Sequence, residues 1–348
     1  MISMEATATT HGEVALITPG EPVKHAPECP LCGGGEILDF LRAPDRFHLR
    51  RDEYHLLRCS SCSCIWLASP PKPEEMSLHY SEDYHKAIVR GGETSASSRW
   101  RGHRELISRH KQGGAILDIG CSSGGFLSTM AGGRWKLYGI EMEASTAEKA
   151  KQCTGAEVFV GDALDAPFPA ASFDVITCFD VLEHVYEPRK FLAKVLDWLK
   201  PGGILYVRLP NIGSWEAKLL GTYWYGLEMP RHLYHFSPQS LRRLTASLGF
   251  KELSITATES GSHLPNSVRY IYEELRRKLG SSPVPLAKAL ASSRPSVLPW
   301  RVVRKLMQVS LVWPWGKVAS AAGAGVFIDA IMAKESSRSD LASERVGS

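Results

Sequence analysis

Two segments decide the fold of this chain: ILDIGCSSGGF, from Ile116 to Phe126, and YGIEM, from Tyr138 to Met142. They have the pattern of a buried strand, a glycine-rich turn, a helix start and a second strand that ends in an acid. From Gly120 to Glu141 the distance is 21 residues, which suits one strand–helix–strand unit. In such a unit the glycines let a ligand approach the backbone, and the acid accepts hydrogen bonds from ribose hydroxyls. The two segments therefore predict a nucleoside pocket.

The spacing of the glycines favours a nucleoside without a pyrophosphate. A dinucleotide loop has the pattern G-x-G-x-x-G, in which the second glycine brings backbone N–H groups to the pyrophosphate. Here Ser122 occupies that second position. On this loop alone, a dinucleotide pocket and a purely structural turn stay open as alternatives.

Further blocks continue the alternation of strands and helices. Val158–Asp162 (VFVGD) predicts a third strand, and Phe173–Cys178 (FDVITC) a fourth. A helix is expected over Pro188–Leu199, where apolar residues recur at helical spacing. Lys200–Gly203 then turn the chain into the strand ILYVRL. The pattern predicts an α/β fold with a doubly wound sheet.

In their order, these blocks resemble the motifs of class I methyltransferases that use S-adenosylmethionine (SAM), over residues 113 to about 260. The resemblance implies a Rossmann-like sheet of seven strands, the last of them antiparallel. Lys251–Glu259 fits the sixth strand and Gly325–Glu335 the seventh.

By motif position, the same resemblance assigns a cofactor site. Glu141 would accept hydrogen bonds from the ribose hydroxyls, Asp162 with Ala163 would contact adenine, and Phe179 would flank the cofactor. Asp118 would border the methionine and ribose part of SAM, or else organise the glycine loop. The full set of expected cofactor residues is Asp118, Gly120, Gly124, Glu141, Asp162, Ala163 and Phe179.

Glu183 and His184 follow the fourth strand, at the carboxyl edge where ligands bind in this class of fold. In sugar C-methyltransferases and ubiquinone-type O-methyltransferases, a matching Glu–His pair lies beside the acceptor. Carried across, the resemblance makes His184 the candidate general base, because an imidazole titrates near neutral pH, with Glu183 beside it. A histidine that only caps the following helix stays open, as does a divalent cation held by Asp180, Glu183 and His184.

A second cluster follows the fifth strand, in WYGLEMPRHLYHFS, from Trp224 to Ser237. It has few helix signals and many groups that bind substrates, so we expect a loop over the acceptor site. Arg231 would pair there with a phosphate or carboxylate. A loop packed by its own aromatic residues is the alternative. Together with one tyrosine of the preceding connector, the candidate substrate residues are Tyr84, Trp224, Tyr225, Arg231, His232 and His235.

Four cysteines near the N-terminus have the spacing of a metal site, in two C-x₂-C pairs separated by 26 residues: Cys29, Cys32, Cys59 and Cys62. Four thiolates close a tetrahedral Zn²⁺ site without an open position, so the expected role is structural. Residues 26–70 are too short for a large core, and metal ligation would supply folding energy. Two unrelated cysteine pairs, or Cys64 in place of Cys62, stay open.

Composition divides the chain into several parts. Residues 1–25 and 336–348 are polar and predicted to be disordered tails. Residues 26–70 form the predicted zinc-binding module, and residues 71–112 a connector that caps the substrate and holds a helix over Ser97–Lys111. Residues 113–335 form the methyltransferase domain, with a basic helical insertion at 261–322.

The insertion 261–322 holds ten Lys and Arg against two Asp and Glu, although the whole chain has a net charge of only +4. Such local basicity suggests an anionic partner or a membrane surface, or else a solvated basic face. A cap on the substrate pocket, a peripheral membrane contact and a dimer interface stay open. The N-terminus lacks a secretory pattern and no run reaches about 18 apolar residues. The sequence therefore predicts a cytoplasmic protein, or one at the inner membrane surface, acting as a monomer or homodimer.

A four-cysteine module followed by this core resembles bacterial deoxysugar C-methyltransferases and their relatives in glycan and natural-product clusters, over residues 26–260. Those enzymes have a large third domain, where this chain has the basic insertion and a final strand. The resemblance implies methyl transfer from SAM to a small-molecule acceptor, either a sugar or a natural-product or glycan precursor. The alternative is an O-methyltransferase acting on a quinone-like or lipid-linked hydroxyl. The mixed charge of the module argues against nucleic acid, and the intact cofactor motifs argue against a non-catalytic SAM-binding protein.

Overall fold

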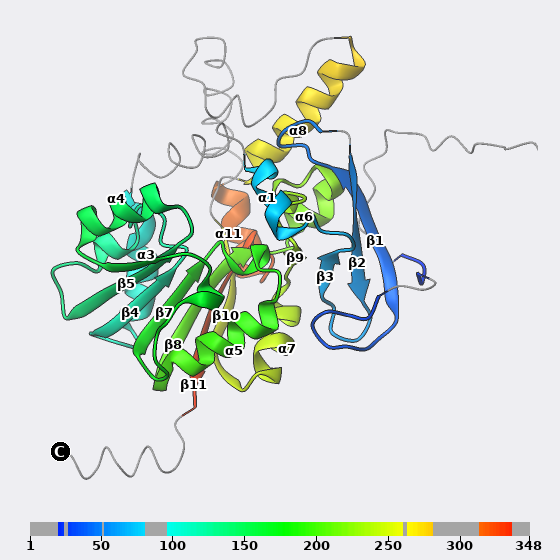
Figure 1. Cartoon of the computed structure of the whole chain (residues 1–348). Coiled ribbons are helices and arrows are strands. Elements are labelled where there is room, and N and C mark those ends of the chain that lie inside the picture. Colours follow the sequence, from blue (N-terminus) through cyan, green and yellow to red (C-terminus); the bar gives the residue numbers. More distant parts are fainter. Residues whose placement is uncertain are drawn as a thin grey trace, which may run out of the picture.

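The computed structural model describes residues 20–23, 27–50, 52–80, 96–259, 263–280 and 313–335. Within them, a sheet of seven strands and a sheet of four strands lie side by side (Figure 1). The larger sheet has the strand order β10-β11-β8-β7-β4-β5-β6. This architecture confirms the predicted α/β, doubly wound fold.

Five parallel strands form the body of the large sheet: β4 (Gly114–Ile119), β5 (Trp135–Glu141), β6 (Glu157–Val160), β7 (Phe173–Phe179) and β8 (Leu199–Pro210). The central strands are covered on both faces, which explains their nearly continuous apolar runs. β11 (Phe327–Lys334) runs antiparallel between β8 and β10 (Phe250–Thr258). The predicted sixth and seventh strands are therefore confirmed, with the seventh inserted beside the fifth.

Helices cover both faces of this sheet (Figure 1). α5 (Pro188–Trp198) and α7 (Pro238–Ser247) bury their apolar stripes on one face. α3 (Ala96–Ser108), η2 (Leu127–Thr129) and α4 (Ala144–Thr154) pack on the other face. The buried residues of α5 are the ones whose helical spacing predicts it, together with Pro188 and Trp198.

The small sheet joins two distant parts of the chain. β1 (Ile37–Pro44), β2 (Glu53–Cys59) and β3 (Ile65–Leu67) come from the predicted zinc-binding module and pair antiparallel. The fourth strand, β9 (Tyr234–His235), comes from the loop after β8 and pairs with β3. The module is thus tied by main-chain hydrogen bonds to the loop expected to cover the acceptor. After β3, α1 (Pro73–Met76) and η1 (Ser77–His79) lead toward the core.

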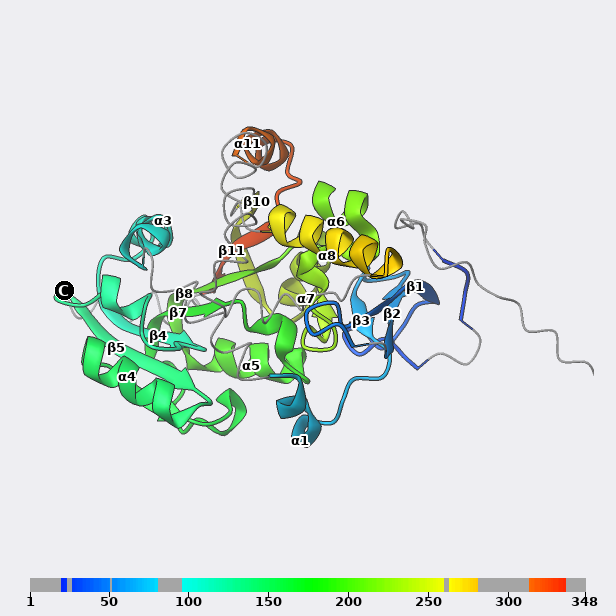
Figure 2. The same cartoon turned by 90° about the horizontal axis from the view of Figure 1, so that it is seen from above.

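The described parts of the basic insertion are two helices, α8 (His263–Lys278) and α11 (Trp313–Ala321). They lie on one side of the molecule together with α6 (Trp215–Leu220) (Figure 2). α8 packs on η5 (Gly221–Tyr223) and η6 (Tyr225–Leu227). It therefore covers the start of the loop from Trp224 to Ser237, named the acceptor loop after its expected role. Residues 281–312 lie outside the described part of the chain.

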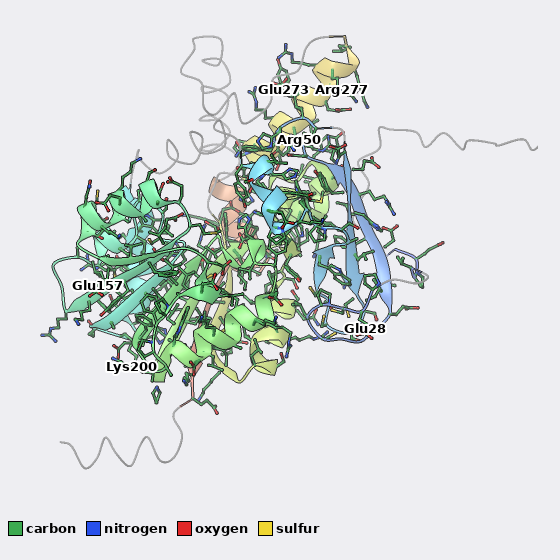
Figure 3. The ribbon with its side chains drawn as sticks, viewed as in Figure 1. Glu28, Arg50, Glu157, Lys200, Glu273 and Arg277 are labelled. Atoms are coloured by element: carbon green, nitrogen blue, oxygen red, sulfur yellow. The ribbon has the colours of Figure 1, made fainter. Side chains whose placement is uncertain are left out.

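The two ends of the large sheet differ in what surrounds them. Glu157 and Lys200 stand at the starts of β6 and β8 and mark its amino-terminal edge (Figure 3). At the opposite, carboxyl edge, β4 is followed by the glycine loop and β5 ends in Glu141. β6 is followed there by η3 (Ala163–Asp165), and β7 by η4 (Leu182–His184). The predicted cofactor residues, together with Glu183 and His184, lie at this carboxyl edge. Among the described helices, none has the length and apolar character needed to span a bilayer.

Candidate functional site

The glycine loop after β4 needs its glycines for both conformation and space. Gly120 and Gly124 have φ angles of 74° and 82°, in the left-handed region that glycine favours. A Cβ on Gly120 would lie 2.5 Å from the side chain of Val181, and one on Gly124 2.8 Å from the side chain of Thr154. Ser122 has a φ of 49° although it is not glycine. The loop therefore passes close to its neighbours and holds one strained residue.

Glu141 stands at the end of β5, partly exposed, beside this loop. Its carboxylate accepts hydrogen bonds from the backbone N–H groups of Ser122, at 2.9 Å, and Glu143, at 3.0 Å. A carboxylate has about four acceptor positions, so about two remain for further donors. This arrangement suits the pair of ribose hydroxyls that the sequence assigns to Glu141.

Asp118 and Asp162 occupy different environments on the same edge. Asp118 is buried below the loop, where it accepts the hydroxyl of Thr177 at 2.6 Å, and burial raises its pKa to about 7. Asp162 is exposed and caps η3 by accepting the N–H of Leu164 at 2.7 Å. The N–H of Gly161 binds the carbonyl of Glu141 at 3.0 Å, which sets Asp162 and Ala163 next to the end of β5. The printed contact of Asp118 ties β4 to β7 through Thr177, and both of its expected roles stay predictions.

Phe179 ends β7 inside a cluster of aromatic rings. The ring of Trp100, on α3, stacks on it with centroids 5.5 Å apart, and Phe126 meets it edge-on at 5.0 Å. The indole nitrogen of Trp100 also lies 3.2 Å from where a Cβ on Gly125 would stand. α3 thus reaches over the glycine loop. The sequence pattern predicts the helix, but it holds no signal for the partner of Trp100.

Glu183 and His184 lie in the short turn η4 directly after β7. Glu183 is 2% exposed, its two carboxylate oxygens have no hydrogen-bond partner among the described residues, and burial raises its pKa to about 8. Nδ1 of His184 lies 2.9 Å from the carbonyl oxygen of Arg231 and 3.2 Å from the hydroxyl of Tyr80. His184 is half-buried, and desolvation by the surrounding protein lowers its pKa to about 3. His184 is therefore uncharged near neutral pH.

The loop after β8 brings a second histidine to this pair. The ring of His232 lies 4.7 Å from that of His184, and one potential ligand atom from each of Glu183, His184 and His232 lies within 4.8 Å of the others. Glu228, which the sequence analysis did not single out, binds Nε2 of His232 at 3.1 Å. Asp180 is not a member of this cluster. Its carboxylate lies 3.6 Å from the guanidinium of Arg208 instead.

Arg231 does not point to a ligand as expected. It is fully buried, and its guanidinium lies 3.3 Å from the carboxylate of Asp45, at the tip of the hairpin between β1 and β2. A buried guanidinium needs an anionic partner, and this chain supplies one itself. No local pattern indicates this contact, because Asp45 belongs to the cysteine module.

The other candidate substrate residues divide into two groups. Trp224 and His235 are buried, and Nε2 of His235 lies 3.0 Å from the carbonyl of Leu227, so they support the loop. Tyr225 is partly exposed and lies near the ring of His263 on α8, at 5.2 Å. Tyr84 lies outside the described residues, and Tyr80 is the connector tyrosine that reaches His184.

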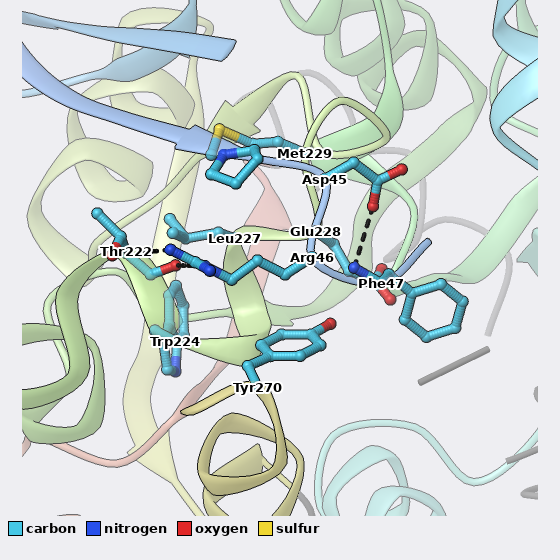
Figure 4. A pocket seen from close by; sticks show the side chains of 10 residues that line it. Asp45, Arg46, Phe47, Thr222, Trp224, Leu227, Glu228, Met229 and Tyr270 are labelled. Atoms are coloured by element: carbon cyan, nitrogen blue, oxygen red, sulfur yellow. Dashed lines mark hydrogen bonds between the residues drawn. The ribbon is translucent and has the colours of Figure 1, made fainter. Parts of the chain in front are cut away.

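A small cavity of about 10 Å³, room for one water molecule, lies where the hairpin tip, the acceptor loop and α8 meet (Figure 4). Nε of Arg46 donates to the carbonyl of Thr222 at 3.0 Å across this junction. Trp224 and Glu228 also line the cavity. The hairpin of the cysteine module is thus packed directly against the loop that carries the histidines.

The four cysteines of the two C-x₂-C pairs converge. All four sulfurs lie within 4.8 Å of one another, with Cys29 and Cys62 at 3.5 Å and Cys32 and Cys59 at 3.6 Å. Sulfur ligands of a tetrahedral Zn²⁺ would be about 3.8 Å apart, so the cluster fits this ion. The thiol of Cys64, a fifth and buried cysteine, lowers the pKa of Cys62 to about 4. By contrast, burial raises the pKa of Cys32 to about 12 and also raises the pKa of Cys59, so the fit to the ion rests on the distances between the sulfurs.

Comparison with known proteins agrees with this geometry. Residues 95–255 match the family described as "Methyltransferase domain". The ubiquinone biosynthesis O-methyltransferase of Idiomarina loihiensis is 26% identical over 161 residues, which cover 41% of this chain and 64% of that protein. A probable S-adenosylmethionine-dependent methyltransferase of Mycolicibacterium smegmatis is 28% identical over 116 residues, 32% of this chain and 45% of that protein. The chain thus spans less than two thirds of the length of these two relatives.

Among solved structures, phosphoethanolamine N-methyltransferase 2 of Haemonchus contortus, in complex with S-adenosyl-L-methionine, matches with a TM-score of 0.50. The two chains are 18% identical, and the match covers 75% of this chain and 60% of that one. At this identity the likeness concerns the fold alone. It agrees with the seven-stranded sheet and its antiparallel last strands.

Proposed function

We propose that the protein transfers the methyl group of SAM to a small-molecule acceptor at the carboxyl edge of the large sheet, because residues 95–255 match the family described as "Methyltransferase domain". The observation that carries this proposal is the position of Glu141. Its carboxylate keeps about two acceptor positions beside a loop whose glycines admit a close ligand. Glu141 ends β5, and Glu183 and His184 follow the end of β7. One strand, β4, separates β5 from β7 in the sheet.

The residues of this edge would divide the work between two ligands. When bound, SAM supplies a methyl group activated by its sulfonium charge. Glu141 would hold the ribose, Asp162 and Ala163 the adenine, and the loop around Gly120 and Gly124 the remaining part. His184 would take a proton from the acceptor through Nε2, because its Nδ1 faces a carbonyl oxygen. Glu183 would bind a polar group of the acceptor, since its own oxygens have no partner among the described residues.

For the acceptor we propose a sugar, or a natural-product or glycan precursor. The cysteine module supports this choice, because it packs against the acceptor loop as part of the same fold. The alternative is a quinone-like or lipid-linked hydroxyl. It is favoured by the name of the Idiomarina relative, and by the end of α8, where Leu275 and the next residue after the helix, Leu279, are exposed beside Arg276–Lys278.

We further propose that Cys29, Cys32, Cys59 and Cys62 hold a structural Zn²⁺. With four thiolates the ion would have no open position for chemistry, so it would stabilise the module alone. The expected metal content is one zinc per chain, which elemental analysis of the purified protein measures. A protein free of zinc with a fully folded small sheet would contradict this assignment.

The acceptor class is tested with SAM labelled in its methyl group. The label is incubated with the protein and an extract of the source cells, and the products are partitioned between water and organic solvent. Label in water-soluble material supports the sugar or glycan precursor, whereas label in the organic phase supports the lipid-linked or quinone-like alternative. A reaction without enzyme and one with Glu141→Ala serve as controls.

The cofactor site is tested separately by calorimetry. Glu141→Ala should weaken SAM binding by at least about tenfold, since two hydrogen bonds to a carboxylate contribute more than about 1.4 kcal/mol. Glu148→Ala, an exposed acid on α4, is the matched control and should bind SAM normally. Unchanged affinity in Glu141→Ala would refute the pocket assignment, and a protein that binds no SAM would favour a non-catalytic role.

A further inference from the structure

Glu183, His184 and His232 converge where η4 meets the loop after β8. Such a cluster has two contrasting uses: it can hold a divalent cation, or it can hold and move protons. A ring nitrogen binds a metal only through a free lone pair. The hydrogen bonds of the two histidines therefore distinguish the two uses.

Both ring nitrogens of His232 face groups that only accept hydrogen bonds. Nδ1 lies 2.9 Å from the carbonyl oxygen of Gly226, and Nε2 lies 3.1 Å from the carboxylate of Glu228. Each nitrogen must then carry a hydrogen, so the ring is an imidazolium. Burial opposes this charge, but the hydrogen bond that His232 donates to the carboxylate of Glu228, together with the charge of that carboxylate, outweighs it and raises the pKa of His232. Burial also opposes the ionisation of Glu228, but His232 outweighs this effect and lowers the pKa of Glu228 to about 2.

His184 is in a different state. Its Nδ1 faces the carbonyl oxygen of Arg231 at 2.9 Å, so Nδ1 carries the hydrogen and Nε2 the lone pair. Desolvation is the largest effect and lowers the pKa of His184, and the charge of His232 lowers it further. The carboxylate of Glu228 acts in the opposite direction, but its effect is smaller than that of His232. A fixed positive charge at a ring distance of 4.7 Å thus disfavours a second proton on His184.

We propose that Glu228 and His232 are positioning residues, a buried ion pair that adds to desolvation in keeping His184 neutral with its lone pair on Nε2, and that the cluster does not bind a divalent cation. The inference rests on the proposed function, because it concerns the proton acceptor of that same site. A metal at this cluster would require His232 to release a proton and give up one of its two hydrogen bonds. The alternative set of Asp180, Glu183 and His184 is not brought together, since Asp180 lies toward Arg208.

The groups packed around His232 do not supply a competing partner. Glu228 is the one carboxylate within 4.0 Å of His232 in the described chain, and Arg231 is neutralised by Asp45. Five other titratable side chains surround the pair. Glu183 and His184 belong to η4, His235 to the loop after β8, Tyr80 to the connector and His263 to α8. His235 and His263 are buried and have their pKa lowered to about 3 by burial, so they add no charge near neutral pH.

The protonation states can be measured directly by NMR on protein labelled with nitrogen-15 in its histidines. Long-range proton–nitrogen correlations would be recorded between about pH 6 and 8.5 and assigned with His184→Gln and His232→Gln. We expect two protonated nitrogens in His232 over the whole range, and protonation at Nδ1 alone in His184. In Glu228→Gln, His232 should lose one proton by pH 8, whereas the matched control Glu187→Gln, a surface acid paired with Lys190, should change nothing.

A neutral His232 in the unsubstituted protein at pH 7 would overturn the proposal. Binding of Mn²⁺ at micromolar concentration, seen as broadening of the His184 and His232 signals, would overturn it as well. Calorimetry with SAM on the same samples keeps the two hypotheses apart. Loss of SAM binding counts against the proposed function, while the histidine signals report on the charged pair alone.

Discussion

At the scale of single residues, Ser122 shows how a departure from the glycine pattern is tolerated. Its backbone adopts the left-handed conformation that a glycine would adopt, with a φ of 49°. A residue with a Cβ is strained there by about 1 kcal/mol. The backbone N–H of Ser122 donates to the carboxylate of Glu141. The strained conformation is therefore held by a contact at the carboxyl edge of the large sheet.

Ser122→Gly should therefore raise the free energy of unfolding, by about 0.5 kcal/mol, because relief of strain exceeds the extra entropy of glycine in the unfolded chain. Urea denaturation measures this difference. Ser123→Gly is the matched control: Ser123 does not have a positive φ, so the same change should lower stability. Equal effects of the two substitutions would contradict the argument from strain.

A buried acid gives a second residue-scale prediction, on pH. Glu216 is 5% exposed, Oε2 has no hydrogen-bond partner among the described residues, and burial raises its pKa to about 8. The folded protein keeps Glu216 protonated at pH values where the unfolded chain has ionised it. The contribution of Glu216 is therefore fully present below about pH 4.5 and is lost as the pH rises to about 8.

Glu216→Gln should remove this pH dependence. Relative to the unsubstituted protein, its stability should increase between about pH 5 and pH 8 by about 2 kcal/mol or more. Thermal or urea unfolding at several pH values measures the change. In Glu252→Gln, an exposed acid paired with Arg242, the pH dependence should stay as it is. Parallel pH profiles for the unsubstituted protein and Glu216→Gln would show that Glu216 is ionised in the fold.

At the scale of elements, α3 is held on the sheet by a few large contacts. Trp100 stacks on Phe179 and meets Phe126, and Nδ1 of His103 lies 2.6 Å from the hydroxyl of Tyr206. Tyr206 in turn donates to Asp329 at 2.7 Å, which links the helix to β11. These contacts place a helix from outside the sheet over the cofactor edge.

Trp100→Ala should lower the free energy of unfolding by about 2–3 kcal/mol, somewhat less than for a fully buried tryptophan, because part of its ring is exposed. It should also weaken SAM binding, since the ring packs on both the glycine loop and Phe179. Denaturation and calorimetry measure the two effects. Arg101→Ala, on the exposed side of the same helix, should stay within about 0.5 kcal/mol. A change in stability with full SAM affinity would limit Trp100 to packing.

At the scale of the whole molecule, the cysteine module and the methyltransferase core are one folded unit. β9 completes the small sheet, and the guanidinium of Arg189 on α5 donates to the carbonyl of Leu31 at 2.8 Å. The ion pair of Asp45 with Arg231 closes the same interface from the hairpin tip. Metal loss should therefore affect the acceptor loop as well as the module.

Chelation of the expected zinc should expose the backbone N–H groups of β1–β3 and of β9 to exchange, because β9 loses its partner strand. Hydrogen–deuterium exchange with and without chelator measures this. The N–H groups of β4, β5 and β7 should stay protected, and SAM affinity should fall less than twofold. Unchanged protection of β9 would mean that the loop is ordered without the module, and loss of protection across the large sheet would mean that the two sheets unfold together.

Much of this organisation follows from local patterns. The strand, loop and acid from Ile116 to Glu141, the helix over Pro188–Leu199 and the late strands were predicted because strands and helices have fixed periods in sequence. The convergence of four cysteines was predicted because their spacing is that of known zinc sites. The pairing of Arg231 with Asp45 was not predicted for the opposite reason: the sequence shows that a cation exists, but not which anion it meets.

The sequence by itself determined the class of fold, the cofactor edge and the cysteine cluster, since each depends on residues close together in the chain or on a spacing that is itself the signal. Only the tertiary structure decided the pairing of Asp45 with Arg231, the stacking of Trp100 on Phe179 and the entry of β9 into the small sheet. It also brought Glu228 and His232 to His184. Such contacts join distant segments, and they depend on how whole elements pack, which no local period in the sequence encodes.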